Sequence, residues 1–180
     1  MDVQHFRVKL FAAAECRPDL GDAIQVFHRW IQEKRLPEVM IDVSDYAHVP
    51  SGPGVILVCH EAIYGLDEGK GRLGLVYSRR TAVDGSIEDR LLQAVNAATT
   101  AAALLEREPE FTRNLRFDRS AWEVTVNDRA LAPNTDETWN RVSPAIQRVF
   151  DLIVGAGKYS LDRHTNPREL FGVTISGKAA

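Results

Sequence analysis

The run Val55-Ile56-Leu57-Val58-Cys59 is apolar throughout and rich in β-branched side chains. Such a run is typical of a central β-strand that is covered on both faces. Either a long alanine-rich helix elsewhere in the chain or a second subunit must supply part of that cover. We therefore predict a strand in the middle of a sheet and a homo-oligomer, most simply a two-fold dimer.

Further strands are predicted on both sides of this run. Residues 39–43 read as a strand, and the Pro- and Gly-rich residues 48–54 form a turn that joins it to the central run. Residues 65–74 contain four glycines and are predicted to be a loop, followed by a strand over residues 73–77.

Three helices are predicted from apolar residues at helical spacing. The first carries Leu20 to Ile31 on one stripe, and the longest runs from about residue 86 to residue 108. The third begins after Asn134, and Pro144 within it is expected to kink or restart it. The apolar faces of these segments, including the three tryptophans, are expected to be buried.

The remaining segments complete an α+β pattern. Residues 6–11 alternate as a half-buried strand, with Arg7 and Lys9 opposite the apolar positions. Residues 115–117 and 122–126 are predicted to form a β-hairpin, and residues 159–161 and 171–175 form two closing strands.

The predicted order is β-α-β-β-β-α-β-β-α-β-β. It indicates a single domain over residues 1–180, with a mainly antiparallel sheet and three helices packed on one face. The two halves share a weak βαββ pattern, which is either an internal duplication or the ordinary recurrence of such units.

Composition narrows the class of protein. The 180 residues include 22 Lys and Arg against 25 Asp and Glu, a formal net charge of −3, so a general nucleic-acid-binding role is not expected. We see no secretory signal and no apolar run long enough to span a membrane. Cys16 and Cys59 are too few for a disulfide framework, so we expect a soluble cytoplasmic protein with reduced thiols.

The segment that follows the central run is one candidate site. Residues at the end of a rigid strand are held well enough to perform chemistry. Histidine is the side chain best suited to act as a general base near neutral pH, so His60 is a candidate, with Glu61 placed to orient it. Tyr64 follows in the same segment as a candidate ligand-binding residue.

A local group of cations is the second candidate. Residues 70–80 contain no acid and hold Lys70, Arg72, Arg79 and Arg80, with Tyr77 among them. We predict that these five residues bind an anionic ligand, with the glycine-rich loop either supplying backbone amides or serving only as a flexible connection. If residues 55–60 paired antiparallel with 72–80, His60 and Arg72 would lie near the connecting loop and Arg79 and Arg80 near its far end.

A third constellation is Asp42, Asp45 and His48. Two carboxylates and an imidazole are ligands for a divalent transition metal, but their spacing of three suits a helix better than the predicted strand and turn. Local hydrogen bonding in the turn is the alternative interpretation.

Two functions from different classes follow. The first is a cytoplasmic module that binds an anionic small molecule or a protein partner, because the chain carries no P-loop, nucleophile elbow or zinc-protease motif. The second is a small-molecule enzyme with His60 and Glu61 as acid-base groups, assisted by a metal at the Asp42, Asp45 and His48 constellation. No particular cofactor is indicated.

Overall fold

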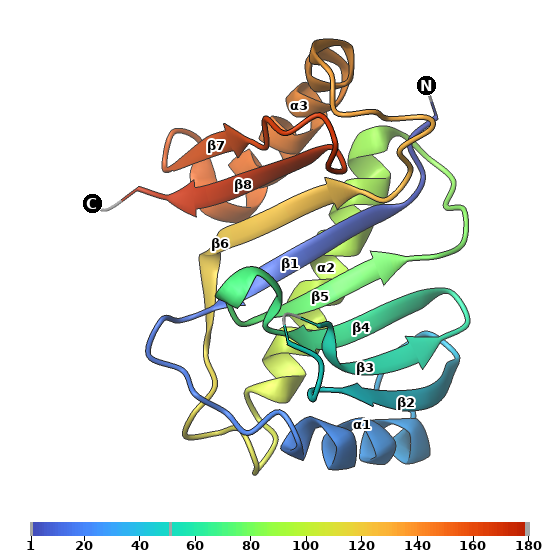
Figure 1. The fold of residues 1–180 in the computed structure, drawn as a ribbon, viewed down its shortest axis with the longest axis vertical. Coiled ribbons are helices and arrows are strands. Elements are labelled where there is room, and N and C mark those ends of the chain that lie inside the picture. Colours follow the sequence, from blue (N-terminus) through green and yellow to red (C-terminus); the bar gives the residue numbers. More distant parts are fainter. Residues whose placement is uncertain (1, 51, 179–180) are drawn as a thin grey trace.

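The sheet of the computed structural model holds eight antiparallel strands in the order β2-β3-β4-β5-β1-β6-β8-β7. The structure describes residues 2–50 and 52–178. The strands are β1 (Phe6–Ala12), β2 (Met40–Tyr46), β3 (Gly54–Cys59), β4 (Ala62–Asp67), β5 (Gly74–Arg79), β6 (Phe117–Val126), β7 (Tyr159–Arg163) and β8 (Gly172–Gly177). The predicted α+β class with an antiparallel sheet and three helices is confirmed (Figure 1).

The three helices cover one face of this sheet. The long helix α2 (Ile87–Leu105) crosses its middle and packs on β1 and β5, while α1 (Asp22–Glu33) packs along β2. The helix α3 (Asp136–Phe150) packs against α2 behind the β7–β8 end (Figure 1). In α3 the helix continues through Pro144 without restarting, and it ends in a π-helical turn over Asp151–Gly155.

The core lies between the sheet and the helices. One row of paired positions across the sheet, Leu57, Tyr64, Tyr77 and Val8, points to the helix layer and is almost fully buried. Trp30 and Trp122 are buried in the same core, and Trp139 packs at its boundary. The prediction that the tryptophans face the interior therefore holds.

The predicted loop at residues 65–74 is partly wrong. Residues 62–67 form β4, a full strand between β3 and β5, and only the short turn η1 (Gly69–Gly71) with its flanks remains a loop. Gly65 suggested a loop, but in β4 it pairs with Ile56, and a Cβ at this position would lie 3.1 Å from Ile56 Cγ2.

The predicted hairpin at residues 115–126 is also wrong. Residues 117–126 are one long strand, β6, which pairs with β1 on one side and β8 on the other. The polar residues that suggested a turn lie near the N-terminal end of this strand. Arg119 pairs there with Glu106 at 2.8 Å, and Asp118 accepts a hydrogen bond from Ser120.

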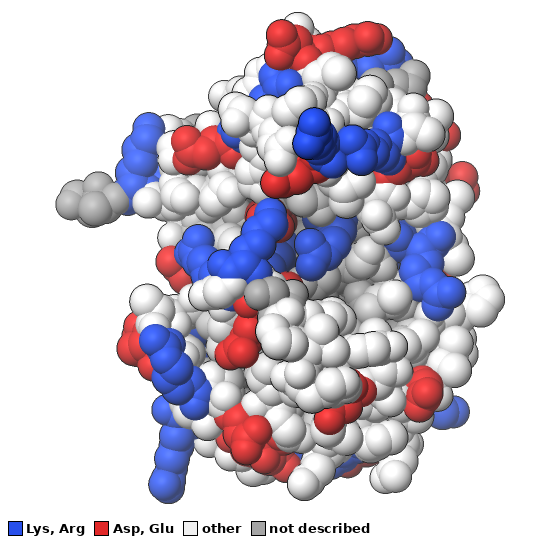
Figure 2. Space-filling model, viewed as in Figure 1, with Lys and Arg blue, Asp and Glu red and all other residues white. Residues whose placement is uncertain are grey.

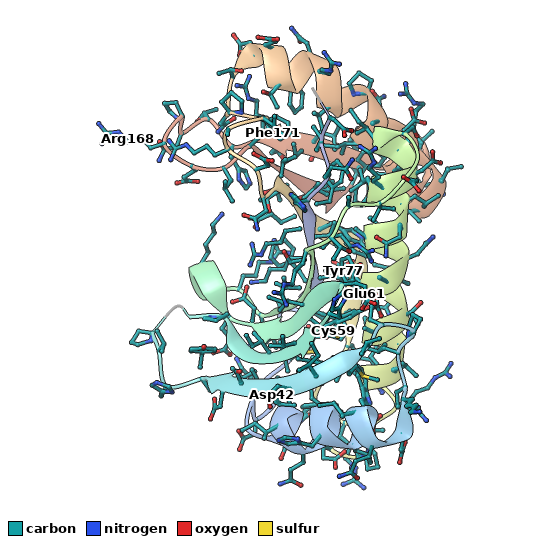
Figure 3. The ribbon with its side chains drawn as sticks, turned by 90° about the vertical axis from the view of Figure 1, so that its right-hand side faces the viewer. Asp42, Cys59, Glu61, Tyr77, Arg168 and Phe171 are labelled. Carbon is teal, nitrogen blue, oxygen red and sulfur yellow. The ribbon has the colours of Figure 1, made fainter. Side chains whose placement is uncertain are left out.

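The face opposite the helices remains open. Along it, alternate residues of β1, β4, β5, β6 and β8 point away from the core. Viewed from the side, α2 lies on one side of the sheet and the loop that carries Arg168 projects on the other (Figure 3).

Candidate functional site

The predicted site residues are divided between two ends of the sheet. Because β4 lies between β3 and β5, His60 lies at the same strand end as Arg79 and Arg80. Arg72 lies at the opposite end of β4, about 20 Å away by strand length. Direct pairing of residues 55–60 with 72–80 would have placed His60 beside Arg72, and this arrangement is wrong. The unpredicted strand β4 lies between the two segments and reverses the chain direction once more.

His60 and Glu61 form the turn between β3 and β4. The His60 side chain is 71% exposed, and its Nδ1 lies 3.8 Å from Glu61 Oε1. Glu61 accepts a hydrogen bond from the backbone N–H of Val39 at 3.1 Å, and Arg80 donates to the carbonyl of Cys59 at 3.2 Å. The Glu61 carboxylate and the Arg80 guanidinium thus hold the ends of neighbouring strands together. The acid-base role of His60 and Glu61 stays a prediction.

Tyr64 and Tyr77 point into the helix layer, not toward the predicted anion site. Tyr64 donates to Glu38 at 2.9 Å, while Tyr77 accepts from Gln93 at 2.9 Å. Burial raises the pKa of both phenols, so both are protonated at neutral pH. Arg79 lies beside Tyr77 on this side and donates to the carbonyl of Thr81. Figure 3 shows Tyr77, Glu61 and Cys59 on the side of the sheet nearest α2.

Asp42, Asp45 and His48 do not meet. Asp42 and Asp45 lie on opposite faces of β2, and each accepts a backbone hydrogen bond from its own neighbourhood. Over residues 2–50 and 52–178, no three His, Cys, Asp or Glu side chains are placed to hold a metal ion together. The hydrogen bonds that Asp42 and Asp45 accept fit the alternative interpretation, in which these residues stabilise the local backbone.

Lys70 and Arg72 lie on the open face together with two cations that were not proposed as site residues. Arg7 and Lys9 project from β1 onto this face, and the Lys9 ammonium lies 2.8 Å from Asp67. Their orientation was predictable from the alternation of β1, whereas their partner Asp67 comes from a strand that was not predicted.

The charges beneath this surface form one connected network. Asp67 also lies 3.5 Å from Arg7, whose other guanidinium nitrogen is 3.8 Å from Glu123 on β6. The Lys9 and Asp67 side chains are only 4% and 5% exposed, and desolvation lowers the pKa of Lys9 despite its partner. Gly74 makes this packing feasible, because a Cβ at that position would lie 2.8 Å from Lys9 Cε.

The turn η1 brings two further cations over the network. Lys70 has a left-handed backbone conformation, with φ of 62°, and its ammonium lies 3.2 Å from Glu123. The Arg72 guanidinium lies 3.7 Å from the centre of the Phe11 ring, a cation-π arrangement that keeps it on this face. A non-glycine residue in this conformation is costly, and such residues are concentrated at functional sites.

Residues 69–74, Gly-Lys-Gly-Arg-Leu-Gly, match the G-x-G-x-x-G spacing of dinucleotide-binding loops. That fingerprint requires a strand before it and a helix after it. Here the residues join two antiparallel strands, β4 and β5. The spacing therefore carries no evidence for a dinucleotide.

Two adjoining cavities make a groove along the open face. One has a volume of about 320 Å³ and is lined by the charged network, Phe11 and the turn η1. The other, of about 380 Å³, has Ile56, Ile63 and Val76 among its lining residues. They share Arg7, Pro53 and Asp67, so they form one continuous depression, which we call the open-face groove.

The surface view agrees with this description. Lys and Arg side chains gather across the middle of this face, where the surface is hollowed (Figure 2). The groove thus combines a charged end with an apolar end, a combination that suits a ligand with an anionic group and an apolar body.

Comparison with known proteins adds no family. No protein-family model matches the chain, and no curated protein matches it significantly. No helix over residues 2–50 and 52–178 combines the length and the apolar character that a membrane crossing requires.

Proposed function

We propose that this protein is a binding module whose open-face groove receives an anionic group. The observation that carries the proposal is the convergence of Arg7, Lys9, Lys70 and Arg72 on one cavity, whose lining within the described chain also includes two acids, Asp67 and Glu123. Lys9 is neutralised by Asp67, whereas Arg7, Lys70 and Arg72 keep guanidinium or ammonium groups on the groove surface.

The mixture of charges supports recognition of a carboxylate or phosphate group rather than of a nucleic-acid backbone. Glu123 lies within 4 Å of both Arg7 and Lys70, so it holds these side chains in place and limits the positive potential. An incoming anion would compete with Glu123 for the same donors, as charge-assisted hydrogen bonds allow. The anion could belong to a small molecule or to an acidic segment of a protein partner.

Binding of defined anions tests this proposal. Succinate and inorganic phosphate represent small molecules, and an oligo-glutamate peptide represents an acidic protein segment. Isothermal titration at low ionic strength is expected to detect at least one of them, and Arg7→Gln or Lys70→Ala is expected to weaken binding by roughly tenfold, since each removes one charge-assisted contact.

The matched control is Arg107→Gln, which removes one exposed cation that makes no side-chain hydrogen bond or ion pair within the described part of the chain. It should bind like the unaltered protein. Tighter binding of the peptide than of succinate would assign the site to a protein partner, and the reverse would assign it to a small molecule. Absence of binding by all three probes, or equal loss in the control, contradicts the proposal.

We also propose that the chain forms a two-fold homodimer and works in the cytoplasm. The edge strand β2 supports the dimer, because Ile41 and Tyr46 are exposed there, as is Val39 just before it. Both cysteines are free and buried, which fits a reducing compartment. Light scattering should give twice the chain mass of 20.1 kDa, and Ile41→Lys should reduce it. The mass of a single chain at every attainable concentration would contradict the dimer.

A further inference from the structure

A separate cavity lies on the helix side of the sheet, away from the open-face groove. Its volume is about 470 Å³, within the range of small-molecule pockets. It is bounded by α2, by Tyr64 of β4 and by residues 36–38, which connect α1 to β2. Leu36, Pro37, Leu92 and Ala97 supply apolar walls.

One carboxylate at this cavity is incompletely paired. Glu38 Oε1 accepts a hydrogen bond from the Tyr64 hydroxyl at 2.9 Å, while Glu38 Oε2 is buried and has no hydrogen-bond partner in the described part of the chain. A buried carboxylate with a single neutral donor is costly. The Glu38 side chain is itself one of the residues that line the cavity.

Within residues 2–50 and 52–178, Glu38 makes no ion pair with a Lys, Arg or His side chain. The lining residues drawn from the described chain include Glu38 and Asp89 but no Lys or Arg. Asp89 is already engaged in capping α2, where it accepts a hydrogen bond from the Ser86 N–H at 2.9 Å. Gln93, Asn96 and Thr100 add neutral polar groups along the α2 wall.

We infer that this cavity binds an organic cation, a primary ammonium or guanidinium on an apolar body, with Glu38 as its counter-ion. The ammonium would donate to the Glu38 carboxylate that Tyr64 orients, and the apolar body would lie against Leu36, Leu92 and Ala97. This cavity differs from the open-face groove in location and in charge. The inference about the cavity therefore does not depend on the proposed function of the groove.

Three probes of nearly equal size test the charge requirement. Phenethylamine is the cation, 2-phenylethanol its neutral analogue and phenylacetate an anion. Saturation-transfer NMR and titration are expected to show that the amine binds at least roughly tenfold more tightly than the alcohol, with no binding of the acid. An amine that binds no more tightly than the alcohol overturns the inference.

Variants then locate the site. Glu38→Gln keeps an acceptor for Tyr64 and is expected to weaken amine binding to the level of the alcohol. Ala97→Leu should reduce binding of the amine and the alcohol alike by filling the cavity. Glu137→Gln, which removes an exposed carboxylate from α3, should change neither. Unaltered amine binding by both cavity variants overturns the assignment.

Discussion

The ion pair between Lys9 and Asp67 is buried on the sheet face that carries no helix. Its two side chains are covered by neighbouring charged and backbone groups, since Lys9 also donates to the carbonyl of Gly69 at 3.2 Å and Asp67 accepts from the Gly69 N–H at 2.7 Å. The pair thus holds the turn η1, and with it Lys70, against the groove.

Replacement of Lys9 tests how much this buried ion pair contributes to stability. Lys9→Met leaves Asp67 buried with only Arg7 at 3.5 Å as a cationic partner, and we expect a loss of about 3 kcal/mol in the free energy of unfolding. Urea denaturation measures it. The double variant with Asp67→Asn should recover part of the loss, and a double variant less stable than Lys9→Met would contradict the account.

The sequence predicted the sheet face to which a side chain points better than the residues with which that side chain pairs. The alternation in β1 placed Arg7 and Lys9 opposite the core, and the structure agrees. Their partners Asp67 and Glu123 lie more than fifty residues away, on strands whose neighbours a local pattern does not reveal. Tyr77 was assigned to the anion site because it lies among cations in the sequence, and Tyr64 was a ligand-binding candidate because it follows His60 and Glu61. Strand alternation turns both side chains into the core.

At the scale of elements, β4 and β6 show where local signals fail. Both carry residues typical of turns, glycine in β4 and Asp118 to Ser120 in β6, yet both are paired on two sides. Pairing with two neighbouring strands outweighs local turn preference. The helix α2 had no such conflict, and its beginning was predicted correctly.

The cap of α2 provides an element-level prediction. Ser86 Oγ accepts a hydrogen bond from the Asp89 N–H at 3.2 Å, which completes a capping box with Asp89. Ser86→Ala should lower the free energy of unfolding by about 1 kcal/mol. Ser86→Asp should retain most of the stabilisation that the cap provides, because Asp is also a favoured N-cap residue. Thermal denaturation measures both. Thr165→Ala, the loss of an exposed hydroxyl in a loop, is the control, and a Ser86→Ala variant as stable as this control would contradict the assigned cap.

At the scale of the whole molecule, the two faces of the sheet differ in chemistry. The open face carries a network of cations and acids, whereas the helix face buries three phenols, of Tyr64, Tyr77 and Tyr159, and the Cys59 thiol, and it borders the Glu38 cavity. The antiparallel sheet and helix layer followed from the sequence because their periodicities are local. The division of the candidate residues between the faces did not, because it depends on the order of the strands.

The buried phenols and thiol predict loss of stability in alkali. Burial raises the pKa of Cys59 from 9.0 to about 12, and it raises those of Tyr64, Tyr77 and Tyr159 above 10.0. The unfolded chain loses the Cys59 proton above pH 9 and the tyrosine protons above pH 10, whereas the folded chain keeps them longer. Stability therefore falls as pH rises, by about 1.4 kcal/mol per pH unit for each group above its own unfolded pKa.

Lys9 acts in the opposite direction. Its pKa is lowered below 10.5, so the unfolded chain keeps this proton longer and the Lys9 contribution rises with pH. The contribution of Lys9 is outweighed by those of the thiol and the three phenols, so urea denaturation between pH 8 and about pH 11 should show a net decline in stability. Stability that rises across this interval would contradict the burial of these groups.

The central claim, that the open-face groove receives an anion, is tested most directly by mapping the bound probe on the folded protein. Backbone amide NMR during titration with the oligo-glutamate peptide, succinate and phosphate should shift signals of Arg7, Lys9, Lys70 and Arg72, and leave those around Glu38 unchanged. Signals that move elsewhere, or do not move with any of the three anions, would contradict the claim.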